Sequence, residues 1–369
     1  MLDTSKLPHL KPQTQTKQED NAPEVSLMRQ IIFVFSSKKG LFYLCSAFVL
    51  IYLTLCVQGE HLLRQGLYNT LKDLGQDGFG ISYHAPSSYL AFKSGLNLDD
   101  LVITAPEKMG GWVFKAGRIT ITSTPFTPRN ITIKINGTHS LTTKTIGDIR
   151  LIIGQGDIKL RLPHKKDPFS VTFNLKQVQT AAPKSMEGFF ISDLSLSAKQ
   201  VFENHEKQDK DAMRFSLSSS VVHLPAYMNR HLPPVLQTAD FKGLMSGVVF
   251  NDAKSFLTGW LNSSGTVELE QGEILWPPFD ASITGTFGLN GSFEPIGAGI
   301  IKAQGFFELL DMFQNGNYLL PRRVSVAKVV LGEQIKMEKN ETTPSLTTAF
   351  SIQSGKLYIG QILLHDNNE

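Results

Sequence analysis

The chain has 369 residues, of which 41% are hydrophobic and 19% charged, a composition typical of a folded globular protein. The formal net charge is +3, and residues 1–40 hold six Lys or Arg against four Asp or Glu, so the remainder is nearly neutral. A nearly neutral domain attracts a phosphate backbone weakly, and we expect no nucleic-acid partner.

The first segment of the chain is polar. Residues 1–30 contain several Gln and Pro and show no apolar period. This composition buries too little apolar surface to fold, so we predict a disordered tail.

An uncharged apolar run follows the tail. Leu41–Val57 (LFYLCSAFVLIYLTLCV) is seventeen residues long and contains no charge, Pro or Gly. As a helix it spans about 25 Å, slightly less than the ~30 Å hydrocarbon layer of a bilayer. A buried core helix normally carries more polar residues, so we predict a transmembrane anchor. Its large apolar residues are Leu41, Phe42, Leu44, Phe48, Val49, Leu50, Ile51, Leu53, Leu55 and Val57.

Basic residues next to the anchor predict its orientation. Lys38 and Lys39 directly precede the run, whereas the first basic residue after it is Arg64. Basic residues are enriched on the cytoplasmic side of membrane helices. We therefore expect the tail in the cytoplasm and the chain after about residue 58 across the membrane.

The two cysteines restrict the chemistry of the exported part. Both Cys45 and Cys56 lie inside the apolar run. The domain beyond the anchor therefore has no disulfide, no thiolate metal ligand and no cysteine nucleophile.

The anchor is predicted to continue outward as an amphipathic helix. Leu63, Leu67, Leu71 and Leu74 follow helical spacing, and glycines follow from Gly75. We expect one helix over residues 38–76.

Beyond this helix the apolar period changes from 3.6 to 2. Asn130–Asn136 (NITIKIN) alternates strictly and is followed by Gly137. Similar alternation recurs at Leu96/Leu98, Ile119/Ile121, Ile158/Leu160/Leu162, Val171/Phe173/Leu175, Leu194/Leu196, Phe215/Leu217, Val267/Leu269, Ile283–Leu289, Val324–Leu331 and Leu357–Leu363. Many short, half-buried strands predict a mainly β (α+β) fold, with a large antiparallel sheet that is curved or two-layered.

Few helices interrupt these strands. We predict short helices at Pro225–Thr238 and Ala253–Trp260, and a clearer one at Phe306–Phe313, within residues 305–315. The charged stretch Lys199–Asp211 lacks a period and is expected to be a loop. It separates a first β-rich half, residues 78–200, from a second, residues 212–369.

The C-terminal third carries a family resemblance. Its elements are Gly265–Trp276, Ile283–Leu289, Gly297–Ile301 with helix Phe306–Phe313, and Ser354–Gly360. This order resembles the uncharacterised bacterial envelope family catalogued as domain of unknown function 2125, and more loosely AsmA-like proteins. The first resemblance implies an inner-membrane protein facing the periplasm, with no known catalytic residues. The second implies lipid handling between membranes.

No motif predicts an enzyme or a cofactor site. Paired glycines such as Gly78 and Gly80 lack the third glycine of a dinucleotide fingerprint. Ser325 and Lys328 have the SxxK spacing, but that motif needs a helix and Val324–Leu331 is predicted as a strand. The histidines are scattered. We therefore predict no catalytic, cofactor-binding or metal-binding residue and no cofactor.

Three functions are compatible with these features. The first is a non-enzymatic envelope protein that binds or passes lipid in an apolar groove of the sheet. The second is a membrane-anchored scaffold or assembly factor for another envelope protein. The third, which has the least support, is a periplasmic hydrolase, and it would require convergent polar groups in a pocket.

Overall fold

The structure is a computed structural model that describes residues 38–88, 93–107, 110–144, 147–164, 167–180, 188–201, 212–225, 231–247, 260, 262–291, 294–333, 335–336, 344–353 and 355–366. The chain divides into two compact units, Met1–Thr54 and Leu55–Glu369. The predicted tail and most of the loop after Lys199 lie outside the described residues, as does most of the predicted helix Ala253–Trp260.

Helix α2 covers Lys38–Gln76 without a break, the residues over which the sequence predicts one helix. It ends where Phe79 N donates to the Leu74 carbonyl at 3.1 Å and Gly78 adopts a φ of 91°. Glycine takes this left-handed conformation at little cost, which explains why the helix stops at this point.

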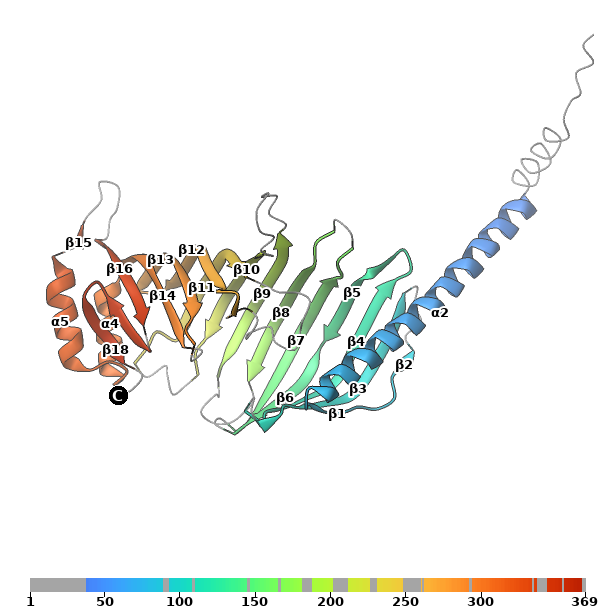
Figure 1. Ribbon diagram of the computed structural model, residues 1–369, viewed down its shortest axis with the longest axis horizontal. Helices are drawn as coiled ribbons and strands as arrows, with labels where there is room; N and C mark the ends of the chain where they lie inside the picture. Colours follow the sequence, from blue (N-terminus) through green and yellow to red (C-terminus); the bar gives the residue numbers. More distant parts are fainter. Residues whose placement is uncertain are drawn as a thin grey trace, which may run out of the picture. The chain divides into compact units, whose positions relative to one another are not determined.

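The protein is mainly β, as predicted, and its described strands form one 18-stranded antiparallel sheet rather than two separate sheets (Figure 1). The strands are β1 (Gly80–Ser82), β2 (Ser87–Ser88), β3 (Ser94–Thr104), β4 (Val113–Thr124), β5 (Thr127–Ile135), β6 (Gly137–Thr143), β7 (Gly147–Arg161), β8 (Ser170–Thr180), β9 (Phe190–Val201), β10 (Ala212–His223), β11 (Val235–Ser246), β12 (Thr266–Trp276), β13 (Phe279–Leu289), β14 (Pro295–Gln304), β15 (Ile335–Lys336), β16 (Ser345–Gln353), β17 (Lys356–Ile359) and β18 (Ile362–Asp366).

Most strands pair with their neighbours in the sequence. From β7 to β14, each strand pairs with the next one along the chain. Lys199–Val201, predicted to begin a loop, instead belong to β9, and β9 pairs directly with β10. β5 and β6 lie end to end between β4 and β7 and meet at Gly137, whose φ is 96°. The sheet is therefore a long meander.

Two helices interrupt the meander between β14 and β16. The first, α4 (Phe306–Asn315), confirms the helix predicted at Phe306–Phe313. The second, α5 (Pro321–Gly332), shows that the predicted strand Val324–Leu331 is wrong. Pro321 supplies a favourable first helical position, and Val324, Ala327 and Leu331 are buried at helical spacing.

The helix predicted at Pro225–Thr238 is also wrong in its described C-terminal part. Residues from Val235 belong to β11 and pair with both β10 and β12. Two prolines, Pro233 and Pro234, directly precede this strand and are incompatible with a helix interior.

Candidate functional site

Strand pairing places an unbroken row of apolar residues on one face of the sheet. Residues directly opposite each other in antiparallel strands point to the same face, so a chain of such pairs follows one row across the sheet. The row is Leu96, Ile121, Ile133, Ile158, Phe173, Leu196, Leu217, Phe241, Gly272, Ile283 and Ile301, from β3 to β14. We call the surface that this row marks the apolar face.

A second row lies on the same face, two residues away along most strands and three along β12, where the register shifts. It runs through Ile131, Leu160, Val171, Ala198, Phe215, Gly243, Leu269, Gly285, Gly299, Phe350 and Ile359, from β5 to β17. Neither row contains a charged residue. The apolar face is therefore a continuous strip that crosses nearly the whole sheet.

The opposite face, which we call the polar face, has a matching polar row. It runs through Asn97, Thr120, Lys134, Asp157, Asn174, Ser195, Ser218, Asp240, Glu273, Ser282, Lys302 and Thr347. Neighbours in it bond to each other: Asn174 donates to Asp157 at 3.3 Å, and Ser195 donates to Asn174 at 2.9 Å. The sheet therefore has one polar face and one apolar face.

Helix α2 covers the apolar face at β3. Ser94 Oγ donates a 2.7 Å hydrogen bond to the Cys56 carbonyl, and both residues are buried. Gly59 permits this close approach, because a Cβ there would lie 2.4 Å from Ser94 Oγ. Leu96 and Leu98, which follow Ser94 on the same face of β3, are 0% and 1% exposed.

A polar clamp fixes the same helix to strand β2. The Glu60 carboxylate accepts hydrogen bonds from Ser88 at 2.6 Å and from Arg64 at 3.0 Å. Arg64 also donates to the Pro86 carbonyl at 3.1 Å. The Ser88 hydrogen bond, helped by Arg64, lowers the pKa of Glu60.

Helices α4 and α5 cover the apolar face at its other end. Phe306, Leu309 and Leu310 of α4 and Val324, Ala327 and Leu331 of α5 form a core with the sheet. The sheet contributes Ala281, Ile301, Ala303 and Leu346, together with residues of β17 and β18. This is the largest hydrophobic cluster of the described residues.

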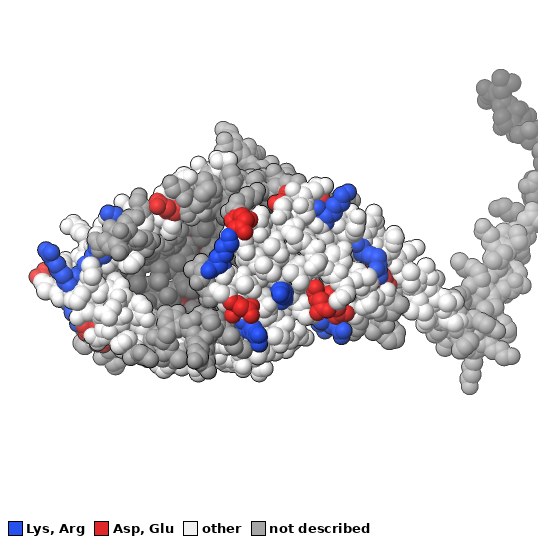
Figure 2. Space-filling model, turned by 90° about the horizontal axis from the view of Figure 1, so that it is seen from below, with Lys and Arg blue, Asp and Glu red and all other residues white. Residues whose placement is uncertain are grey.

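Between the two covered ends, no described helix packs on the apolar face. Most of its side chains from β8 to β11 are only half-buried, and Leu196 is 39% exposed. One small cluster, Ile153, Leu175 and Val178, is buried near β7 and β8. Figure 2 shows charged groups scattered over the described surface on one side of the molecule. The middle strands thus present apolar surface without a described cover.

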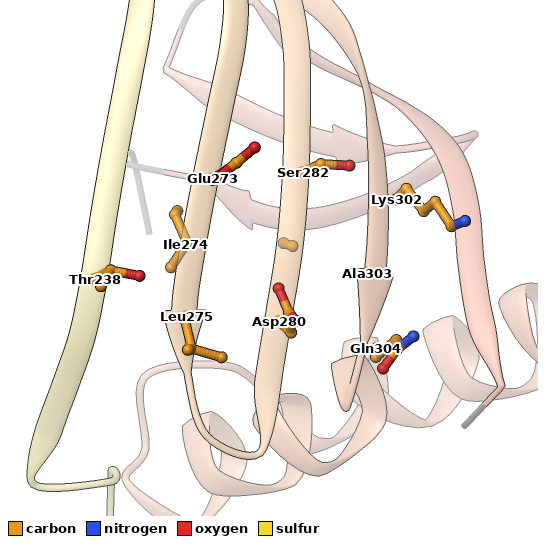
Figure 3. A pocket seen from close by; sticks show the side chains of 10 residues that line it. Thr238, Glu273, Ile274, Leu275, Asp280, Ser282, Lys302, Ala303 and Gln304 are labelled. Atoms are coloured by element: carbon orange, nitrogen blue, oxygen red, sulfur yellow. The ribbon is translucent and has the colours of Figure 1, made fainter. Parts of the chain in front are cut away.

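A pocket of about 400 Å³ lies across β11–β14 (Figure 3). Glu273, Ser282 and Lys302 of the polar row line it, with Asp280 and Gln304 beside them. Ala281 and Ala303, which also belong to the core with α4 and α5, complete the lining together with Thr238, Ile274 and Leu275.

A histidine is buried where sequence reasoning found only scattered histidines. His139 of β6 is 2% exposed, and neither ring nitrogen has a hydrogen-bond partner among the described residues. Its ring stacks on Phe114, with centroids 6.1 Å apart. Burial lowers the pKa of His139, which favours the neutral ring.

The chain matches the model of a family described as an uncharacterized protein conserved in bacteria (DUF2125) over residues 92–365. The chain belongs to this family. The match confirms the first resemblance seen in the sequence but does not show similarity to AsmA-like proteins. No curated protein and no solved structure matches the chain. The matched residues include every strand that contributes to the apolar rows, whereas α2 precedes them.

The predicted anchor residues lie in the first half of α2. Phe48, Val49, Leu50, Ile51, Leu53, Leu55 and Val57 are 38% to 65% exposed. The side chains of Lys38, Lys39, Leu41, Phe42 and Leu44 lie outside the described part. Within the part of the chain that was searched, no helix is both long enough and apolar enough to cross a membrane.

The reason for rejecting the SxxK spacing is wrong, because Ser325 and Lys328 lie on helix α5. Their contacts are nevertheless structural. Ser325 Oγ donates to the Pro321 carbonyl at 3.0 Å, and Lys328 Nζ donates to both Asp311 carboxylate oxygens at 2.5 Å. Among the described residues, no group of three His, Cys, Asp or Glu is placed to hold a metal ion.

Proposed function

We propose that this protein is a non-enzymatic, membrane-anchored protein of the bacterial envelope that binds lipid acyl chains along its apolar face. The observation that supports this best is the uncharged apolar strip, which is covered by helices at both ends and half-exposed between them. A soluble protein seldom leaves a large continuous apolar surface in water, and such surfaces usually bind a partner or ligand.

The dimensions of the open section suit an acyl chain. Strands lie about 4.8 Å apart, so the five strands from β7 to β11 span about 19 Å. One acyl chain occupies roughly half of a ~30 Å hydrocarbon layer, or about 15 Å. A chain lying across the strands would contact Phe173, Leu196, Leu217 and Phe241 in turn.

The anchor in this proposal is Leu41–Val57, with the N-terminus in the cytoplasm and the sheet in the periplasm. Its support is the uncharged run itself and the exposure of Phe48, Leu50 and Ile51. Apolar side chains that project on all sides of a helix favour a lipid environment. α2 then continues directly onto the apolar face at Ser94. The looser AsmA-like resemblance agrees with lipid handling and forms part of the same proposal.

Lipid binding can be tested with a pair of variants from one strand. Leu196→Lys places a charge on the apolar face, whereas Ser197→Lys places the same charge on the polar face one residue away. We expect bound lipid, measured by native mass spectrometry of the purified full chain and by photocrosslinking with a photoactivatable fatty acid, to fall at least severalfold in Leu196→Lys. The Ser197→Lys variant should retain the bound lipid. Equal labelling of both variants, or no lipid on the unmodified protein, would refute the proposal.

The second candidate is a scaffold for another envelope protein that docks at an edge of the sheet. Among the described strands, β18 (Ile362–Asp366) pairs with β17, and a strand at the edge of a sheet can accept a strand from a partner. Crosslinking in intact cells from a photoreactive residue at Leu363 should then recover one dominant protein. Recovery of none would eliminate this candidate.

A further inference from the structure

Helix α5 has an apolar outer face that the sheet does not use. Val324, Ala327 and Leu331 are buried, but Val326, Val329 and Val330 on the opposite side are 45%, 72% and 45% exposed. Valine is a poor helix former, so three exposed valines on one short helix are not explained by helix propensity. α5 lies at the C-terminal end of the sheet (Figure 1).

The charges that flank these valines are arranged symmetrically. Arg322, Val326, Val329 and Glu333 follow the spacing i, i+4, i+7 and i+11, which keeps them on one side of a helix. Glu333 has helical backbone angles, φ −70° and ψ −18°, so this geometry includes it. Both charged residues are exposed, and neither has an ion-pair partner among the described residues. A positive group and a negative group therefore lie about 16 Å apart with valines between them.

We infer that α5 pairs with α5 of a second copy of this chain in an antiparallel, two-fold symmetric contact. The midpoint between Arg322 and Glu333 is also the midpoint between Val326 and Val329. A two-fold axis at this point brings Val326 opposite Val329 of the second copy and Arg322 opposite its Glu333. The ion pair between Arg322 and Glu333 of the other copy therefore forms twice, as a self-complementary interface requires.

Charge complementarity favours a second copy of this chain over other binding partners for the outer face of α5. A parallel pair would bring Arg322 against Arg322 and Glu333 against Glu333, which is repulsive. An anionic lipid surface would attract Arg322 but repel Glu333. A different protein would need an acidic and a basic residue placed opposite Arg322 and Glu333, with apolar residues between them. A second copy of α5 in antiparallel orientation already provides this arrangement.

The expected dimer is weak. Two 12-residue helices bury less than the roughly 1,200 Å² of a small stable interface, so we expect a dissociation constant in the micromolar range or weaker. Confinement of both copies to one membrane would raise their effective concentration.

Charge reversal provides the test. Sedimentation velocity of the full chain in detergent, over a concentration series, should show reversible dimers for the unmodified protein. Arg322→Glu alone and Glu333→Arg alone each create like-charge contacts and should weaken dimerisation roughly tenfold. The double variant Arg322→Glu/Glu333→Arg, and an equimolar mixture of the two single variants, should restore it. Glu308→Arg, a charge reversal at an exposed site on α4, is the control and should have no effect.

Several results would overturn the inference. These are a protein that stays monomeric at all concentrations, single reversals that leave the dimer unchanged, or a double variant that fails to recover. If the protein is monomeric but Val329→Glu abolishes its flotation with anionic vesicles, the outer face of α5 binds a lipid surface instead. If Val329→Glu abolishes crosslinking to a different protein, the face belongs to that partner.

Discussion

The Ser94 hydroxyl of β3 donates a 2.7 Å hydrogen bond to the backbone carbonyl of Cys56, one turn before Gly59 in helix α2. In a regular helix this carbonyl already accepts from an amide one turn later, so the serine is an additional partner at a buried point. The bond joins helix and sheet at a point where Gly59 leaves little space between them.

Gly59 should be intolerant of a side chain for this reason. A Cβ at Gly59 would lie 2.4 Å from Ser94 Oγ and 3.1 Å from Ser94 Cβ. Gly59→Ala should lower the free energy of unfolding by about 1 kcal/mol or more, despite the better helix propensity of Ala. Gly66→Ala is the control: nothing lies within 4 Å of its Cβ, and the change should raise stability by about 0.5–1 kcal/mol. Denaturant titration measures both, and a stabilised Gly59→Ala would contradict the close contact.

Two leucines of the same apolar row should respond differently to truncation. Leu96 of β3 is 0% exposed, whereas Leu196 of β9, in the middle of the sheet, is 39% exposed. Leu96→Ala should lower the free energy of unfolding by about 2–5 kcal/mol, and Leu196→Ala by less than about 1 kcal/mol. The comparison uses lipid-free protein in denaturant titrations. Equal losses would show that the middle of the apolar face is covered.

Glu60 should make stability depend on pH in the acid range. The Ser88 and Arg64 contacts lower its folded pKa, so the folded state binds its proton less readily than the unfolded state. The stabilisation is complete above the unfolded pKa of about 4.3 and is lost as pH falls through the lower folded pKa. In urea titrations from pH 7 to pH 3, the free energy of unfolding should fall less for Glu60→Gln than for the unmodified protein. If the free energy of unfolding depends on pH in the same way for both proteins, groups other than Glu60 cause the dependence.

His139 should add a second pH dependence at a higher pH. Its folded pKa is lowered, so the unfolded state binds the proton more readily, starting near the unfolded pKa of about 6.5. The stability is complete above that value and falls as pH drops toward the lowered folded pKa. His139→Leu should remove this loss between pH 7 and pH 5. His84, whose side chain is 75% exposed, provides the control His84→Gln, which should leave the loss intact.

Strand positions were predictable because a strand with one buried face has alternating apolar and polar residues. Asn130–Asn136 and Ile283–Leu289 show this pattern, and both lie in strands. Register was not predictable, because it depends on which strands pair. Nothing in the sequence alone shows that Phe173 lies opposite Leu196, or Leu196 opposite Leu217. The continuous apolar row is therefore a finding of the structure.

Helix α5 was missed for an identifiable reason. Val324, Val326 and Val330 alternate in a way typical of a strand, and β-branched residues favour strands. The competing signal was Pro321 at the helix start together with buried residues at i, i+3 and i+7. Tertiary packing against α4 and β18 outweighed local propensity. His139 likewise gave no sequence signal, since its burial depends on pairing with both β4 and β7.

The meander from β7 to β14 also makes the length of the sheet adjustable. Among the described strands, each one from β8 to β13 pairs only with its neighbours in sequence, and α2 and the α4–α5 pair contact opposite ends of the sheet. Inserting or deleting one hairpin in the middle would leave both ends intact and preserve the in-and-out alternation, as in repeat proteins built from stacked units. Each hairpin added or removed would change the span of this sheet by about 9.6 Å, the width of one pair of strands.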